Sequence, residues 1–130
     1  MLERFRVHAS VAAADIERAR GWYRDRLGVE PRMTDPGGGM WFEFGAGSWL
    51  YVYPTAMAGT AQNTVAGWTV SGIEDVMADL RARGVVFEEY DLPGLKTVDG
   101  LATWDGTAKA AWFKDSEGNT FELSEVLARP

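Results

Sequence analysis

Residues 112–123 of the 130-residue chain have the sequence WFKDSEGNTFEL, and this stretch decides the fold. The polar run from Asp115 to Asn119 holds the residue types that favour turns, and apolar residues flank it on both sides. The pattern predicts a β-hairpin with strands at 109–114 and 120–126. An earlier hairpin of the same design is expected at 40–44 and 48–53.

Each hairpin ends a segment with the order strand, helix, three strands. In the first segment, alternation over 5–11 predicts a strand, Asp15 caps a helix that stops at Gly28, and 29–34 predicts a short strand. In the second segment, the corresponding features are a strand at 64–70, a Ser-x-x-Glu capping box at 71–74, a stop at Gly84 and a strand at 85–89. A loop at 91–107, rich in glycine and containing Pro93, is expected either to cover a cavity as a mobile lid or to act as a passive connector.

The two segments can be overlaid on each other. Ile16 and Ile73, which open the two helices, are 57 residues apart, and Trp41 and Trp112 in the two hairpins are 71 apart. This repetition predicts a single α+β domain over 1–130, built from two β-α-β-β-β modules at approximately 1–54 and 64–126. We expect the modules to form a curved mixed sheet around a cavity, with the helices outside.

Composition limits the functions that remain. Lys and Arg total 13 against 19 for Asp and Glu, a net charge of -6, so the chain lacks the positive field that attracts nucleic acid. The absence of cysteine removes thiol nucleophiles and cysteine-based metal sites. No apolar run approaches the roughly 18 residues of a membrane span, and charges interrupt the first ten positions. We therefore expect a cytoplasmic protein with no membrane and no nucleic-acid partner.

Two stretches resemble the vicinal-oxygen-chelate superfamily, also called the glyoxalase/bleomycin-resistance/dioxygenase superfamily. The first runs from His8 through Asp15 to GWYRDRLGV at 21–29, and is similar to the family's signature of Asp, amphipathic helix, Phe/Tyr and Leu-Gly. The second, KDSEGNTFEL at 114–123, resembles the family's closing hairpin, with Ser116 in place of proline. The resemblance covers nearly the whole chain and is specific for fold but weak for reaction. It also implies a homodimer that binds a small molecule.

The resemblance further implies where a divalent metal would bind, at one position in the first and one in the last strand of each module. Those positions are His8, Tyr51, Val65 and Glu122. Only His8 and Glu122 have the family's ligand types, and with a single histidine the two-His-one-carboxylate set of extradiol dioxygenases cannot form. A shifted strand register would bring Gln62, Asn63 or Thr64 to the site. We expect no tight metal and no other cofactor, with weak divalent metal binding at His8 and Glu122 as the remaining option.

Six tryptophans are more than this length usually carries, and with the tyrosines they predict an aromatic-walled cavity. Flat apolar walls suit an aromatic or extended ligand, and the acidic charge favours a cationic one. Trp22 and Trp112 are instead expected in the core or at an interface. The predicted ligand-binding residues are Trp41, Trp49, Tyr51, Tyr53, Trp68 and Trp104.

Three functions remain open from the sequence, and whether the protein is an enzyme is not decided by it. The favoured one is a small-molecule-binding protein of the glyoxalase/bleomycin-resistance type, without a tight metal, acting in sequestration or resistance. The alternative is a glyoxalase-like lyase or isomerase that uses His8 and Glu122 as partial metal ligands or as a catalytic acid/base pair. His8 and Glu122 would otherwise form a plain structural ion pair. An interaction module with a filled core is the third.

Overall fold

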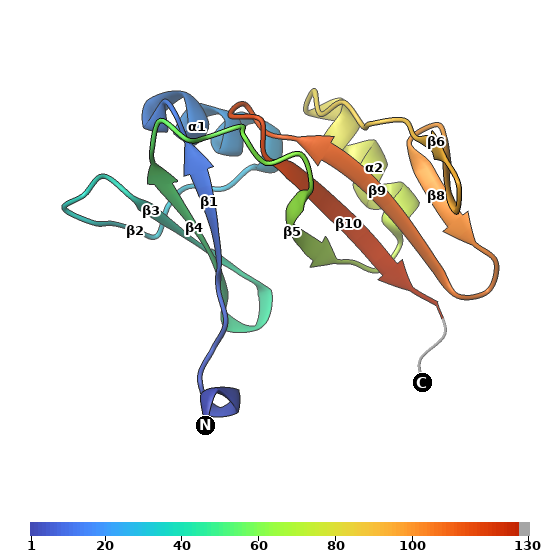
Figure 1. Cartoon of the computed structure of the whole chain (residues 1–130), viewed down its shortest axis with the longest axis horizontal. Coiled ribbons are helices and arrows are strands. Elements are labelled where there is room, and N and C mark those ends of the chain that lie inside the picture. The colour runs from blue at the N-terminus through green and yellow to red at the C-terminus, as the bar shows by residue number, and fades with distance from the viewer. Residues whose placement is uncertain (128–130) are drawn as a thin grey trace.

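The computed structural model describes residues 1–127 and contains two mixed β-sheets, each with one α-helix (Figure 1). The N-terminal sheet has the strand order β1-β4-β3-β2, and the C-terminal sheet has the order β5-β10-β9-β8-β7-β6. This arrangement confirms the α+β prediction. The elements are β1 (Ala9–Ala13), α1 (Ile16–Trp22), a π-helical turn (Tyr23–Leu27), β2 (Met33–Thr34), β3 (Met40–Phe44), β4 (Ser48–Pro54), β5 (Thr64–Thr69), α2 (Ile73–Ala82), β6 (Asp91–Leu92), β7 (Leu95–Val98), β8 (Leu101–Trp104), β9 (Ala108–Lys114) and β10 (Thr120–Val126), with short 3-10 turns at Leu2–Arg4 and Gly45–Gly47.

The two halves repeat the same connections. β1 is parallel to β4 and β5 is parallel to β10, whereas the hairpins β3–β4 and β9–β10 are antiparallel. The repeat extends to a reciprocal contact, because the guanidinium of Arg83 lies against Gly28 and that of Arg26 lies against Gly84. Arg26 and Arg83 are 57 residues apart. Each arginine thus brings a cation near the end of the other module's helix, where the helix dipole favours positive charge.

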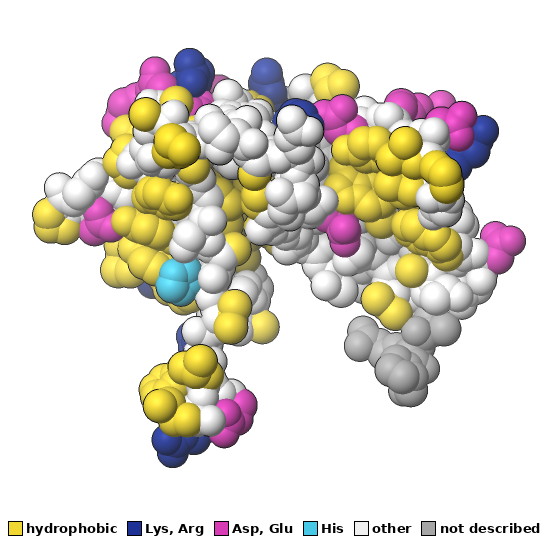
Figure 2. All heavy atoms as spheres, in the orientation of Figure 1, with side chains coloured by type: hydrophobic (Ala, Val, Ile, Leu, Met, Phe, Trp, Pro, Cys, Tyr) yellow, Lys and Arg dark blue, Asp and Glu magenta, His cyan; other side chains and the backbone are white. Residues whose placement is uncertain are grey.

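Alternation along the strands gives each sheet two different faces. One face packs against the helices and forms the core, with Phe42 and Val52 from the N-terminal sheet and Phe113 and Phe121 from the C-terminal sheet. Tyr23, in the π-helical turn, is fully buried among them. No helix of residues 1–127 covers the opposite face of either sheet, which we call the open face. Figure 2 shows hydrophobic side chains gathered on this side over both sheets, with the histidine beside the N-terminal group.

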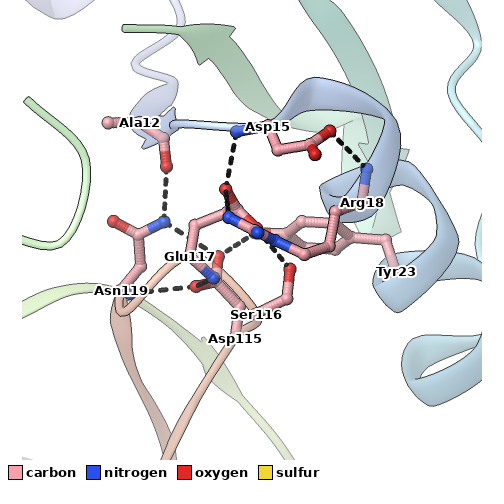
Figure 3. Close-up of polar contacts among 8 residues, drawn as sticks. All are labelled: Ala12, Asp15, Arg18, Tyr23, Asp115, Ser116, Glu117 and Asn119. Atoms are coloured by element: carbon pink, nitrogen blue, oxygen red, sulfur yellow. Dashed lines mark hydrogen bonds and ion pairs between the residues drawn. The ribbon is translucent and has the colours of Figure 1, made fainter. Parts of the chain in front are cut away.

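The turn at 115–119 fastens the closing hairpin to the first module (Figure 3). The side-chain amide of Asn119 donates to the carbonyl of Ala12 and to Asp115, each at 2.8 Å, and the Tyr23 hydroxyl donates to Asp115 at 2.8 Å. Asp115 also accepts the backbone N–H groups of Glu117 and Asn119 at 2.9 Å. Because Tyr23, Asp115 and Asn119 are buried, these bonds satisfy groups that water cannot reach.

Glu117 links the same turn to the start of α1. Its carboxylate accepts the backbone N–H of Asp15 at 2.9 Å and two bonds from the Arg18 guanidinium at 2.8 and 3.1 Å. Burial by itself would raise the pKa of Glu117, but the hydrogen bonds from Arg18, the Asp15 N–H and Ser116 lower it to about 2. The turn motif therefore carries a buried anion held by the first helix.

The first strand is shorter than predicted. It begins at Ala9 instead of Phe5, and Val7 is 91% exposed. Ala9 pairs with Leu50 near the start of β4, so the residues before Ala9 run past the end of the β3–β4 hairpin. His8 consequently lies just outside the sheet.

Two predictions for the second module are wrong. The segment 85–89 is not a strand but makes a single bridge, between Phe87 and Phe113, because β8 takes the neighbouring position along β9. The segment 91–107 is neither a lid nor a passive connector, since it forms β6, β7 and β8 and extends the sheet.

The start of α2 also differs from the predicted capping box. The N-cap is Gly72, with φ of 68°, and no side-chain cap bond comes from the helix's own residues. Instead Glu125 of β10 accepts the N–H groups of Gly72 and Ile73 at 2.7 and 3.2 Å. These two bonds lower the pKa of Glu125. Both helix starts thus receive a carboxylate from the closing hairpin or its turn.

Candidate functional site

A row of aromatic rings crosses the open face of the N-terminal sheet. Trp41 of β3 stacks on Tyr51 of β4, with ring centroids 4.4 Å apart, and Tyr51 stacks on Tyr53 at 5.9 Å. His8 meets Trp41 edge to face at 4.8 Å, and Trp49 does so at 6.3 Å. We call these five residues the aromatic row. They lie together because Trp41 opposes Tyr51 in the β3–β4 ladder, and residues two apart on β4 share a face.

Asp35 holds the middle of the aromatic row in place. The Tyr51 hydroxyl donates to one oxygen of Asp35 at 2.6 Å, and the Gly39 N–H donates to the other at 2.9 Å. The bond from Tyr51 lowers the pKa of Asp35, and the same bond raises the pKa of Tyr51. Glycine is required at position 39, because a Cβ there would overlap the hydroxyl oxygen of Tyr51.

One end of the aromatic row opens into a hollow of about 220 Å³. Tyr53, which is 36% exposed, lines it together with Ser10 of β1 and Val65 of β5. The linker between β4 and β5 contributes Met57 and Thr60 to its wall. The hollow therefore lies between the two modules on the open side, with both apolar and hydroxyl groups in its walls.

The C-terminal sheet places Glu122 on its open side. Glu122 is partly buried and lies between Gly67 of β5 and Trp112 of β9 in the ladder. Within residues 1–127 its carboxylate has no hydrogen bond or ion pair, and it forms none with His8. The structure therefore does not bring His8 and Glu122 together as an ion pair within one chain.

The four positions at which the resemblance implies a metal do not supply a full set of metal ligands in one chain. Within the described part, no group of three or more His, Asp or Glu side chains is placed to hold an ion. His8 is exposed and packs on Trp41, Tyr51 is bonded to Asp35, and Val65 offers no ligand atom. A resident divalent metal of the kind the resemblance implies does not fit this donor set.

The remaining two predicted ligand-binding residues lie elsewhere. Trp68 is on the core side of its sheet, where it stacks on Phe113 at 6.1 Å. Trp104 is exposed on β8 of the same C-terminal sheet, away from the aromatic row. Sequence reasoning missed Asp35 because its Asp-Pro-Gly run indicated only a turn, and nothing local shows that Tyr51 faces that turn.

Comparison with known proteins supports the fold. No protein-family model matches the chain, and no curated protein matches it. A glyoxalase/bleomycin resistance protein from Catenulispora acidiphila is similar in structure, with a TM-score of 0.71 and 21% identity, covering 94% of this chain and 98% of that one. No helix within residues 1–127 is long and apolar enough to span a membrane.

Two further solved structures have related folds. One is the fosfomycin resistance protein FosX from Listeria monocytogenes, complexed with Mn(II) and sulfate, at a TM-score of 0.67 and 13% identity, covering 94% of this chain and 90% of that one. The other is a lactoylglutathione lyase from Agrobacterium tumefaciens, at a TM-score of 0.67 and 17% identity, covering 93% and 92%. At these identities the likeness establishes the fold and leaves the reaction to the residues of this chain.

Proposed function

Starting from the vicinal-oxygen-chelate fold, which this chain has, we propose that the protein binds a flat apolar or aromatic small molecule without a tight metal. The observation that carries the proposal is the aromatic row, which ends at the hollow beside Tyr53. Partly exposed aromatic rings in a group offer large apolar area and a preferred stacking geometry to a planar ligand. Sequestration or resistance in the cytoplasm is the role that follows.

The charge around the aromatic row favours a cationic ring. Asp35 is held ionised next to Tyr51 by two hydrogen bonds, and the chain carries a net charge of -6. A cation near tyrosine or tryptophan gains from the negative ring face as well as from the nearby carboxylate. We therefore place planar organic cations ahead of neutral or anionic ligands at this site.

We also propose that the protein is a homodimer. Among residues 1–127 the rings of the aromatic row stay exposed or only partly buried, on the open face that Figure 2 shows. A second copy placed over this face would enclose them. Light scattering at several protein concentrations measures the mass directly. A monomer at all concentrations would remove this part of the proposal and leave the ligand site as an open platform.

The second candidate function is a lyase or isomerase that uses His8 and Glu122 as an acid/base pair. The supporting observation is that the Glu122 carboxylate carries no hydrogen bond among the described residues, as a general base needs before it meets substrate. In this candidate the two side chains act on a ligand that lies between them.

Proflavine, a planar tricyclic cation, is the probe that tests the binding function. We expect it to quench tryptophan fluorescence in the presence of EDTA, and to bind about tenfold more weakly to Trp41→Ala and Tyr53→Ala. Trp104→Ala removes an exposed tryptophan from the other sheet, so it is the matched control and should leave the affinity unchanged. Loss of proflavine binding in Trp104→Ala, with unchanged binding in Trp41→Ala, would contradict the proposed site.

Calorimetric titration with Zn, Ni, Mn and Fe(II) separates the two candidates. We expect no binding tighter than about 1 μM. Stoichiometric metal binding with a dissociation constant below about 1 μM, lost in both His8→Ala and Glu122→Ala, would overturn the metal-free proposal. Assays of the glyoxalase type would then be the next measurement.

A further inference from the structure

A separate apolar hollow lies on the helix side of the molecule, between the two modules. It has a volume of about 230 Å³. Leu27 of the π-helical turn and Phe44 of β3 line it from the first module, and Trp68 of β5 with Val76 and Leu80 of α2 line it from the second. Thr69 is the one residue with a polar side chain among those that line the hollow.

Three aromatic rings meet at this hollow. Trp68 stacks nearly parallel to Phe113, with an angle of 13°, and meets Phe44 edge to face at 5.4 Å. Phe113 is fully buried, whereas Trp68 and Phe44 are only partly buried. A ligand that covers water-exposed apolar side chains in a concave site removes apolar surface from water, which lowers the free energy of the complex.

We infer that this hollow is a second ligand site, for a small neutral molecule built from two or three apolar rings. An apolar cavity of about 150 Å³ can hold benzene, and sites for drug-sized ligands begin near roughly 300 Å³. The hollow lies between these sizes. No charged side chain lines it, so a charged group buried there would have no partner.

None of the five residues of the aromatic row lines this hollow, so the inference does not rest on the proposed function. Residues of opposite parity along β5 point to opposite sides of the sheet, so Trp68 lines this hollow while Val65 lines the one on the open side. The chemistry also differs, because Asp35 adjoins the open-side row and no carboxylate lines the helix-side hollow. The two sites therefore select different ligands.

A matched pair of fluorescent probes tests the inference. N-phenyl-1-naphthylamine is neutral, and 1-anilinonaphthalene-8-sulfonate adds one sulfonate to the same rings. We expect the neutral probe to bind with enhanced emission and the sulfonate to bind at least about tenfold more weakly. Equal affinity for both probes would contradict a hollow without charged groups.

Substitutions that fill the hollow locate the probe. Val76→Trp fills it from α2 and Leu27→Trp fills it from the other module, and each should weaken binding of the neutral probe at least about tenfold. Val86→Trp is the matched control, because Val86 is 81% exposed and lies outside the hollow. Two filling variants keep the test decisive if one of them fails to fold.

Three results would overturn the inference. The first is unchanged affinity in both filling variants, and the second is loss of neutral-probe binding in Trp41→Ala with retention in Val76→Trp. The third concerns a second copy of the chain as the occupant. If Val76→Trp converts a dimer into a monomer in light scattering, the hollow is a subunit interface, whereas an unchanged mass supports a ligand site.

Discussion

Trp41 and Trp112 occupy equivalent positions in the two modules but have different surroundings. Trp112 is 8% exposed, because Tyr90 meets its ring at 5.5 Å and Leu95 packs on the same small cluster. Trp41 is only partly buried, and its neighbours His8 and Tyr51 belong to the aromatic row. The same residue type is core in one module and part of a candidate binding surface in the other.

The cause of the difference is the additional chain in the second module. Between α2 and β9 the chain forms β6, β7 and β8, and residues from this region cover the open face around Trp112. Between α1 and β3 the first module has only the two-residue strand β2, so nothing equivalent covers Trp41. An insertion in one repeat thus decides which open face remains available for a ligand.

Truncating the two tryptophans tests the comparison directly and should give the largest effect. Trp112→Ala leaves a cavity in a buried cluster and is expected to lower the free energy of unfolding by about 4 kcal/mol. Trp41→Ala should lower it by about 1 kcal/mol, because part of the ring is already in water. Urea unfolding measures both, and equal losses would mean that the two faces are buried alike.

Removing the hydrogen bonds by which the 115–119 turn holds the first module should have the next largest effect on stability. Asp115→Ala removes the acceptor of the Tyr23 hydroxyl, of two backbone N–H groups and of one of the two bonds from the Asn119 amide, so we expect the free energy of unfolding to fall by about 3 kcal/mol. Asp105→Ala, in an exposed turn, is the control and should change stability by less than about 0.5 kcal/mol. Similar midpoints for the two variants in urea would show that the fastening adds nothing.

Acid should weaken the same fastening through Glu117. Because the pKa of Glu117 is about 2 in the folded chain, below its ordinary 4.5, the unfolded chain takes up the proton more readily. The contribution of Glu117 to the free energy of unfolding is complete above about pH 4.5 and is lost as the pH falls toward 2. We expect the free energy of unfolding to fall by about 2 kcal/mol over this range. The loss is no larger because solvent screens the exposed Arg18 partner.

Glu117→Gln should flatten the fall in stability over this pH range. Glu17→Gln, at an exposed position of α1, should leave the profile as it is and serves as the control. Unfolding followed by circular dichroism between pH 2 and 6 measures both. Parallel profiles for the native chain and Glu117→Gln would remove Glu117 as the source of the acid sensitivity.

Removing the carboxylate that caps the start of α2 should have the smallest effect, a local change in amide exchange. Glu125→Gln removes the charge that accepts two N–H bonds at the start of α2, so the amides of Gly72 and Ile73 should exchange with solvent about fivefold faster. The first turn of α1, which is capped by Asp15 and Glu117, should keep its protection. Faster exchange at both helices would indicate a global loss of stability.

The sequence predicted the parts of the fold that depend on local patterns and on the repeat. The hairpins, the N-cap at Asp15 and the helix stop at Gly28 follow from residue types that act over a few positions. The strand at 85–89 and the capping box at 71–74 were wrong because distant elements took over, with β8 along β9 and Glu125 at α2. Local patterns could not reveal this competition.

For the candidate site, the predicted aromatic residues divide by which side of a sheet they face. Alternation within the β3–β4 hairpin was enough to group Trp41, Trp49, Tyr51 and Tyr53. It could not place Trp68, whose side depends on how the two modules pack. Asp35 lay beyond reach because its partner Tyr51 is sixteen residues away in the chain.

The fastening at 115–119 also constrains the order in which the chain can finish folding during synthesis. The ribosome releases β1, α1 and Tyr23 well before Asp115, Glu117 and Asn119. Until then the Tyr23 hydroxyl, the Asp15 N–H and the Ala12 carbonyl lack their final partners. The first module is therefore completed only after the 115–119 turn has emerged, and a nascent chain stalled before residue 115 would hold this module in an unfinished state.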